Sequence, residues 1–148
     1  MFSILFNCTG PTTLVSDTLL ALAAQSDRNF ELQLLDPSPP ARMTAQLLDL
    51  NVTDHLSGDF RIELTAFDIP LAHWLSTFAA HTADGIERVT ACAARQPIGW
   101  RHWGREVGFE PTGPVETDSG DVTVAQAASR TGAQPHVDEF TLLRRYVS

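Results

Sequence analysis

The feature of this sequence that most constrains its fold is the alternation between strand-like and helix-like patterns. Residues 60–67, Phe-Arg-Ile-Glu-Leu-Thr-Ala-Phe, place apolar side chains at every second position, which is typical of a strand with one buried face. Residues 2–8 and 30–36 are shorter strand-like runs, and each is followed by a proline or glycine break. Because helix-like segments separate these runs, the order predicts a mixed α/β architecture.

Two helix-like segments lie between the first three predicted strands. Within residues 11–25 the apolar side chains recur at i, i+4, i+7 and i+8, so they share one helical face. Pro40 suits the opening of a second, shorter helix. Met43, Leu47 and Leu50 have the spacing expected of its inner side. We therefore expect both helices to pack on the sheet through these faces.

A third helix is expected directly after the alternating strand. Asp68 is a suitable N-cap, Pro70 suits the first turn, and an apolar stripe follows before Gly85. The stripe consists of Leu71, Trp74, Leu75, Phe78 and Ala79. Residues 86–93 predict the next strand, and residues 97–107 predict a further helix.

The C-terminal part of the chain is rich in Gly, Pro, Ser, Thr and Asp. Residues 111–137 predict a long loop or hairpin excursion, in which Val122-Thr-Val124 is the only strand-like stretch. Residues 139–147 predict a closing strand. The length of 148 residues suits a single domain spanning residues 1–148.

Charge and cysteine content exclude several classes of protein. The formal net charge is −8 and all ten cationic side chains are arginine, which argues against binding to nucleic acid or an anionic membrane. No apolar run reaches the roughly 18 residues that a membrane helix needs, and residues 2–6 lack the cationic flank of a signal peptide. Cys8 and Cys92 are too few for a disulfide scaffold and too far apart for a zinc site. We expect a soluble, untargeted protein in which both cysteines are reduced and buried.

Three C-terminal segments carry a family resemblance. They are residues 86–93, residues 100–113 with Trp103 ahead of Gly108-Phe109, and residues 138–145. Together they resemble the C-terminal half of the GNAT N-acetyltransferase superfamily, and most closely the small acetyltransferase-like proteins encoded among the late genes of tailed bacteriophages. The resemblance implies an α/β fold with a GNAT-like mixed central sheet flanked by helices and an antiparallel C-terminal hairpin.

The sequence departs from the GNAT pattern at two positions that matter for chemistry. The loop that would cradle the pyrophosphate of acetyl-CoA, residues 66–71, contains no glycine, while Asp68 repels phosphate and Pro70 removes an N–H donor. Where many members place a tyrosine that protonates the departing thiolate, this chain has Gly104. We therefore expect no cofactor, with acetyl-CoA required only if the chain is an active enzyme.

A few side chains remain as candidates for a functional site. The resemblance places Glu63 beside the substrate cleft, where its carboxylate would act as a base; otherwise it lies on the solvent face of an alternating strand. Arg101 and Arg105 are candidates to bind the phosphate of CoA or an acidic partner, or they are solvated side chains that balance nearby glutamates. His73 and His81 lack the spacing of a helical ligand pair, so no metal site is expected.

Three functional hypotheses follow. The first is a GNAT-like domain with a degenerate cofactor loop that works through protein contacts, as a cytoplasmic or virion-associated bacteriophage late-gene protein whose partner is a virion assembly or a second copy. The second is an active acyl-CoA-dependent N-acyltransferase acting on an amine, with Glu63 as the base. The third is a small binding module whose Gly-Phe pair is coincidental. The main-chain N–H groups of residues 67–71 distinguish the first two hypotheses. If these groups converge on an open cleft, they favour the acyltransferase; if side chains or another subunit block them, they exclude it.

Overall fold

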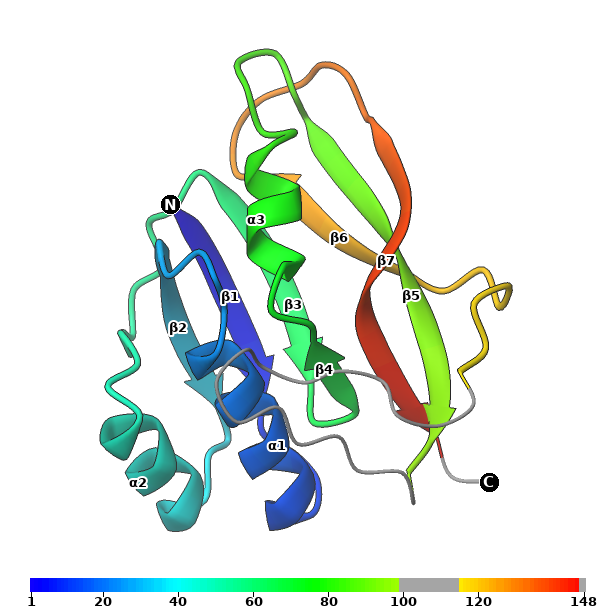
Figure 1. The fold of residues 1–148 in the computed structure, drawn as a ribbon. Coiled ribbons are helices and arrows are strands. Elements are labelled where there is room, and N and C mark those ends of the chain that lie inside the picture. The colour runs from blue at the N-terminus through cyan, green and yellow to red at the C-terminus, as the bar shows by residue number, and fades with distance from the viewer. Residues whose placement is uncertain (99–114, 147–148) are drawn as a thin grey trace.

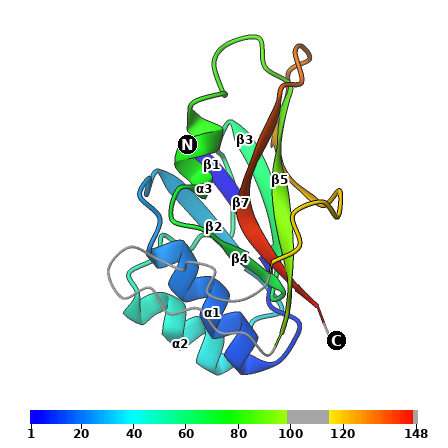
Figure 2. The same cartoon turned by 45° about the vertical axis from the view of Figure 1, so that its right-hand side comes forward.

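The computed structural model describes residues 1–98 and 115–146, and in them seven strands form one mixed, curled sheet (Figures 1 and 2). The strands are β1 (Phe2–Asn7), β2 (Phe30–Leu35), β3 (Phe60–Thr65), β4 (Asp68–Pro70), β5 (Arg88–Pro97), β6 (Val122–Ala127) and β7 (His136–Tyr146). The helices are α1 (Thr12–Ala23), α2 (Pro39–Leu47) and α3 (Trp74–Ala79). The strand order is β2-β1-β3-β6-β5-β7-β4, which confirms the expected mixed α/β class.

The N-terminal half forms a parallel sheet with its helices on one side. β1 lies between β2 and β3 and pairs parallel with both, so that Ile4 is opposite Leu32 on one side and Ile62 on the other. These three side chains are almost fully buried, in a core that also contains residues of α1, α2 and α3. The strands predicted at residues 2–8, 30–36 and 60–67 are therefore confirmed, and the other face of the sheet carries no helix of the described chain (Figure 2).

The face through which α2 packs differs from the prediction. Met43 and Leu47 were expected on the inner side, but their side chains are 63% and 79% exposed, and Ala41 and Ala45 are buried instead. Both pairs have i, i+4 spacing, so helical periodicity alone does not separate them. The small alanine face allows α2 to lie close to the rest of the protein, which leaves the larger side chains in solvent.

The third helix is shorter than predicted. Asp68 caps no helix, because residues 68–70 form β4, which pairs antiparallel with β7. Pro70 fits this strand because β4 is at the edge of the sheet, where a missing N–H is tolerated. The apolar stripe is confirmed in part: Trp74, Leu75 and Phe78 of α3 are fully buried in the core, whereas Leu71 is buried ahead of the helix and Ala79 is exposed.

The C-terminal strands do not form the expected hairpin with each other. β6 pairs antiparallel with one edge of β5, whereas β7 pairs parallel with the other edge. β5 also continues to Pro97, so that this residue ends a strand and does not open the helix predicted at residues 97–107. The rest of that helix and Gly108-Phe109 lie outside the described residues.

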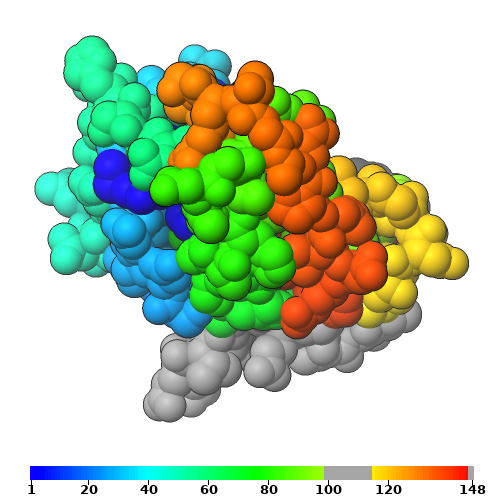
Figure 3. Space-filling model, turned by 90° about the horizontal axis from the view of Figure 1, so that it is seen from above, coloured from blue at the N-terminus to red at the C-terminus, as the bar shows by residue number. Residues whose placement is uncertain are grey.

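One hydrophobic core joins the two halves of the sheet. It contains residues of α1, α2, α3 and every strand except β4. Seen from above, the start of the chain, the α3 region and the C-terminal strands lie side by side in blue, green and orange to red (Figure 3). None of the described helices is long and apolar enough to cross a membrane.

A caged carboxylate fixes the loop that precedes β3. Glu31 is buried and accepts hydrogen bonds from the Ser3 hydroxyl at 2.7 Å, the Gly58 N–H at 3.0 Å and the Ser57 N–H. Burial alone raises the pKa of this carboxyl, but the hydrogen bonds outweigh burial and lower the pKa below its usual value. Gly58 fits here because a Cβ would lie 2.5 Å from the carbonyl oxygen of Met1.

Candidate functional site

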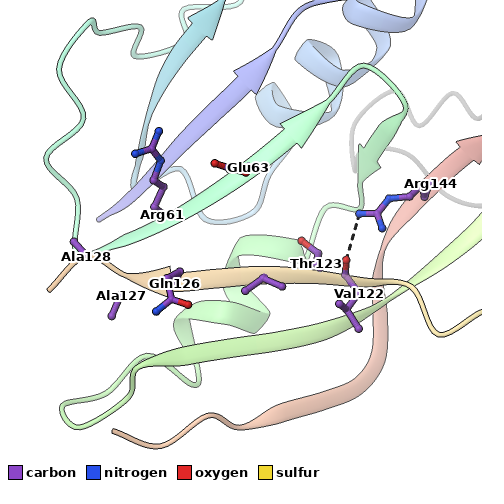
Figure 4. Close-up of a pocket in the computed structure, with 9 residues that line it drawn as sticks. Arg61, Glu63, Val122, Thr123, Gln126, Ala127, Ala128 and Arg144 are labelled. Carbon is purple, nitrogen blue, oxygen red and sulfur yellow. Dashed lines mark hydrogen bonds between the residues drawn. The ribbon is translucent and has the colours of Figure 1, made fainter. Parts of the chain in front are cut away.

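A groove opens where β3 and β6 diverge (Figure 4). In the described structure the two strands pair only at Phe60 with Ala127 and at Arg61 with Gln126. Beyond these positions a cavity of about 470 Å³ lies between them, and we call it the β3–β6 groove. Its lining residues are Arg61, Glu63, Val122, Thr123, Val124, Gln126, Ala127, Ala128 and Arg144.

The charged side chains of β3 line one wall of the groove. Because side chains alternate along a strand, Ile62 and Leu64 enter the core while Arg61 and Glu63 are exposed on the opposite face. Within residues 1–98 and 115–146, neither Arg61 nor Glu63 is held in an ion pair or a side-chain hydrogen bond. Both charges are therefore available to a ligand in the groove.

A chain of hydrogen bonds spans the wide end of the groove. The Asp68 carboxylate accepts from the main-chain N–H of Thr65 at 2.9 Å and from Arg144 Nε at 3.0 Å. Arg144 Nη2 then donates to the carbonyl oxygen of Val122 at 3.3 Å, which is the dashed line in Figure 4. This chain connects the end of β3 to the start of β6 through β4 and β7, so it fixes the separation of the two diverging strands.

The floor of the groove rests on the core. Thr123 is buried, and its hydroxyl accepts a hydrogen bond from Trp74 Nε1 at 3.1 Å. Trp74 in turn packs edge-on against Phe78, with ring centroids 5.9 Å apart. The floor is therefore held by a buried aromatic pair and not by a mobile surface side chain.

A second cavity of about 560 Å³ adjoins the groove and shares Glu63 and Arg144 with it. Its other lining residues are Thr65, Phe67, Asp68, Arg95, Asp121, Arg145 and Tyr146. The Arg95 guanidinium lies 4.6 Å from the centre of the Tyr146 ring, and its Nε is 3.4 Å from an Asp121 oxygen. Since three arginines here face three carboxylates, the cavity has no net positive charge to attract a pyrophosphate.

The loop expected to hold a pyrophosphate uses its amides within the fold. Residues 68–70 pair with β7, the Leu71 N–H donates to Thr141 at 2.9 Å, and the Phe67 N–H donates to the Thr65 hydroxyl at 3.3 Å. α3 begins only at Trp74 and has six residues, so the loop does not lead directly into a helix. These residues do not fit the pyrophosphate of acetyl-CoA.

The predicted site residues are only partly brought together. Glu63 lies on the exposed face of β3 and lines the groove, whereas Arg101 and Arg105 lie outside the described residues. Arg144 and Asp68 were missed as site residues because they meet across 76 positions of sequence. No local spacing connects them; only the register of β4 with β7 does.

Histidines and cysteines were also placed by the structure. His73 Nε2 lies 3.2 Å from a Glu139 oxygen, and Nδ1 of His81, which follows α3, lies 2.9 Å from the carbonyl oxygen of Thr77. Among residues 1–98 and 115–146, no group of three or more His, Cys, Asp or Glu side chains is arranged to hold a metal ion.

Cys8 is buried as expected, and burial raises its pKa to about 11. Cys92 is only half-buried, which corrects the prediction that it is a buried core residue, and its Sγ lies 3.6 Å from Nε2 of His136.

Neither a protein-family model nor a curated protein sequence matches this chain. The fold and the groove define the chain as a mixed α/β domain with one sheet, in which the neighbouring strands β3 and β6 diverge.

Proposed function

We propose that this chain is a GNAT-like binding domain that works through protein contacts and holds an extended segment of a partner protein in the β3–β6 groove. The observation that carries the proposal is the divergence of β3 from β6 after two paired positions. Beyond Arg61 and before Gln126, neither strand edge has a strand partner across the groove in the described chain. An extended peptide can add to such an edge through main-chain hydrogen bonds.

The side chains of the groove supply selectivity for such a segment. Arg61 and Glu63 present opposite charges two positions apart on one strand, while Val122 and Val124 offer apolar surface on the other. A bound strand that alternates charged and apolar side chains matches this pattern, because its successive side chains point to opposite faces. From the family resemblance, we expect the partner to be a virion component or a second copy of the chain.

The alternative function, acyl-CoA-dependent N-acyl transfer to an amine with Glu63 as the base, has less support. Glu63 does lie in a cleft of suitable size. The donors of residues 67–71, however, are used within the sheet, and Asp68 adds a carboxylate where a phosphate would have to lie. The observed geometry therefore favours binding over acyl transfer.

The proposal is tested by selecting random dodecapeptides on the immobilised full chain and measuring their affinity for variants by fluorescence anisotropy. Arg61→Glu reverses one charge in the groove, and Arg42→Glu is a matched control at an exposed arginine on α2. We expect selected peptides to lose about tenfold in affinity for Arg61→Glu, roughly 1.4 kcal/mol, and to bind Arg42→Glu as tightly as the wild type.

Two outcomes would contradict the proposal. Peptides that bind Arg61→Glu and the wild type equally would place the binding surface outside the groove. Binding of acetyl-CoA in calorimetry, weakened by Glu63→Gln, would favour the acyltransferase instead.

A further inference from the structure

A second constellation of reactive side chains lies on β5 and β7, outside the groove. Cys92 Sγ is 3.6 Å from Nε2 of His136, and the Thr90 hydroxyl is 2.7 Å from Nδ1 of the same ring. An Asp138 carboxylate oxygen lies 3.5 Å from Nε2. We call these four residues the thiol–imidazole cluster.

The register of the sheet explains why the cluster forms. β5 and β7 are parallel, Thr90 is opposite His136, and Cys92 follows Thr90 by two positions on the same face of β5. The pairing then shifts on both sides of Cys92, so that Asp138 and Glu139 are extra residues on β7 before its partner Phe140, and Thr141 is an extra residue after it. Bulges of this kind re-aim side chains and are frequent beside functional sites. Asp138 follows His136 by two positions on β7, and its carboxylate lies beside the His136 ring.

We propose that Cys92 is a reactive thiol that forms a mixed disulfide with a small-molecule disulfide, with His136 as the base. His136 Nε2 accepts the proton of the Cys92 thiol as Sγ attacks one sulfur of the small disulfide. A bond forms between Sγ and that sulfur, the original S–S bond breaks, and the released thiolate takes the proton back from Nε2. One thiol and one disulfide are consumed, and one mixed disulfide and one small thiol are produced.

The neighbours of His136 suit this role. When Nδ1–H donates to the Thr90 hydroxyl, Nε2 is left unprotonated and faces the thiol, which is the tautomer that a base requires. The imidazolium that forms is stabilised by the exposed Asp138 carboxylate at 3.5 Å. Thr90 and Asp138 are therefore positioning residues for the histidine.

The position of the other cysteine favours a mixed disulfide with a small molecule over a disulfide within the chain. The sequence contains two cysteines, and the other one, Cys8, is buried in the core, so it is not accessible to resolve the mixed disulfide within the same chain. Cys8 also provides an internal reference, because burial raises its pKa to about 11 and it should not react in the folded protein.

The experiment measures the rate of Cys92 alkylation by iodoacetamide at neutral pH, and of adduct formation with oxidised glutathione, by intact-mass spectrometry and peptide mapping. The variants are His136→Gln, Thr90→Val and Cys92→Ser, with His81→Gln as a matched control at an exposed histidine on another face. Each protein is also alkylated in denaturant, where every cysteine reacts without its folded surroundings.

We expect Cys92 in the folded wild type to be alkylated about tenfold faster than the same cysteine in denaturant. In folded His136→Gln the alkylation rate of Cys92 should fall about tenfold below that of the folded wild type. The alkylation rate of Cys92 in Thr90→Val should lie between those of the wild type and His136→Gln, and the rate in His81→Gln should match that of the wild type. A folded-state rate at or below the denatured rate would overturn the proposal, as would equal rates in folded wild type and folded His136→Gln. A disulfide-linked dimer in place of the glutathione adduct would overturn the assignment to a small-molecule disulfide.

Discussion

Removing the guanidinium of Arg145 should be among the most destabilising single changes in this protein. Its side chain is 2% exposed, and Nη1 lies 2.8 Å from a carboxylate oxygen of Asp17, which is 7% exposed. Nη2 also donates to the carbonyl oxygens of Leu14 at 3.2 Å and Ala66 at 2.8 Å. One side chain therefore ties α1 to β7 and to the turn between β3 and β4.

The magnitude follows from what Arg145→Met leaves behind. The Asp17 carboxylate stays buried without its cation, and breaking a buried ion pair in this way costs about 3–5 kcal/mol. Since the free energy of unfolding of a domain is about 5–15 kcal/mol, the variant should lose about a fifth of its stability or more. Replacing both partners, in Asp17→Leu/Arg145→Met, removes the unpaired charge and should recover all but about 1–2 kcal/mol.

Urea denaturation followed by circular dichroism measures these differences from the midpoints and slopes. Arg42→Met, at an exposed arginine, is the control and should stay within about 0.5 kcal/mol of the wild type. A loss below about 1 kcal/mol for Arg145→Met, or a double variant no more stable than the single one, would refute the argument.

Three further predictions concern the caged carboxylate, the groove floor and α2. Because hydrogen bonds lower the pKa of Glu31 in the folded state, its contribution to stability is present above the usual pKa of 4.5 and is lost as pH falls through the lower folded-state value. Glu31→Gln should therefore be less stable than the wild type in urea titrations at pH 7, with a difference that shrinks in acid; a difference independent of pH would contradict this. Trp74→Phe removes the hydrogen bond to Thr123 and should cost about 1–3 kcal/mol by the same assay, and a neutral result would show that the bond contributes nothing. Met43→Gln/Leu47→Gln removes the two most exposed large apolar side chains of the described structure and should reduce self-association in sedimentation velocity, whereas unchanged sedimentation would exclude α2 as a contact between copies.

Part of the candidate site follows from local sequence. The alternation over residues 60–67 predicts that Ile62 and Leu64 face the core and that Glu63 points outward, and the structure confirms both. The helical stripe likewise predicts the burial of Trp74 and Phe78. These predictions succeed because successive side chains of a strand point to opposite faces and those of a helix recur every 3.6 residues, whatever lies elsewhere in the chain.

Local pattern does not predict which strands pair. Main-chain hydrogen-bonding groups are the same at every residue except proline, so a strand pattern carries little information on its partner. The sequence therefore determined the α/β class, most of the strands and the outward direction of Glu63. Only the tertiary structure decided that β6 leaves β3 after two pairs, that Arg144 meets Asp68 across 76 positions, and that Cys92 meets His136 across 44. Each of these contacts depends on the packing of the whole sheet, where register and bulges set the distance between side chains remote in sequence.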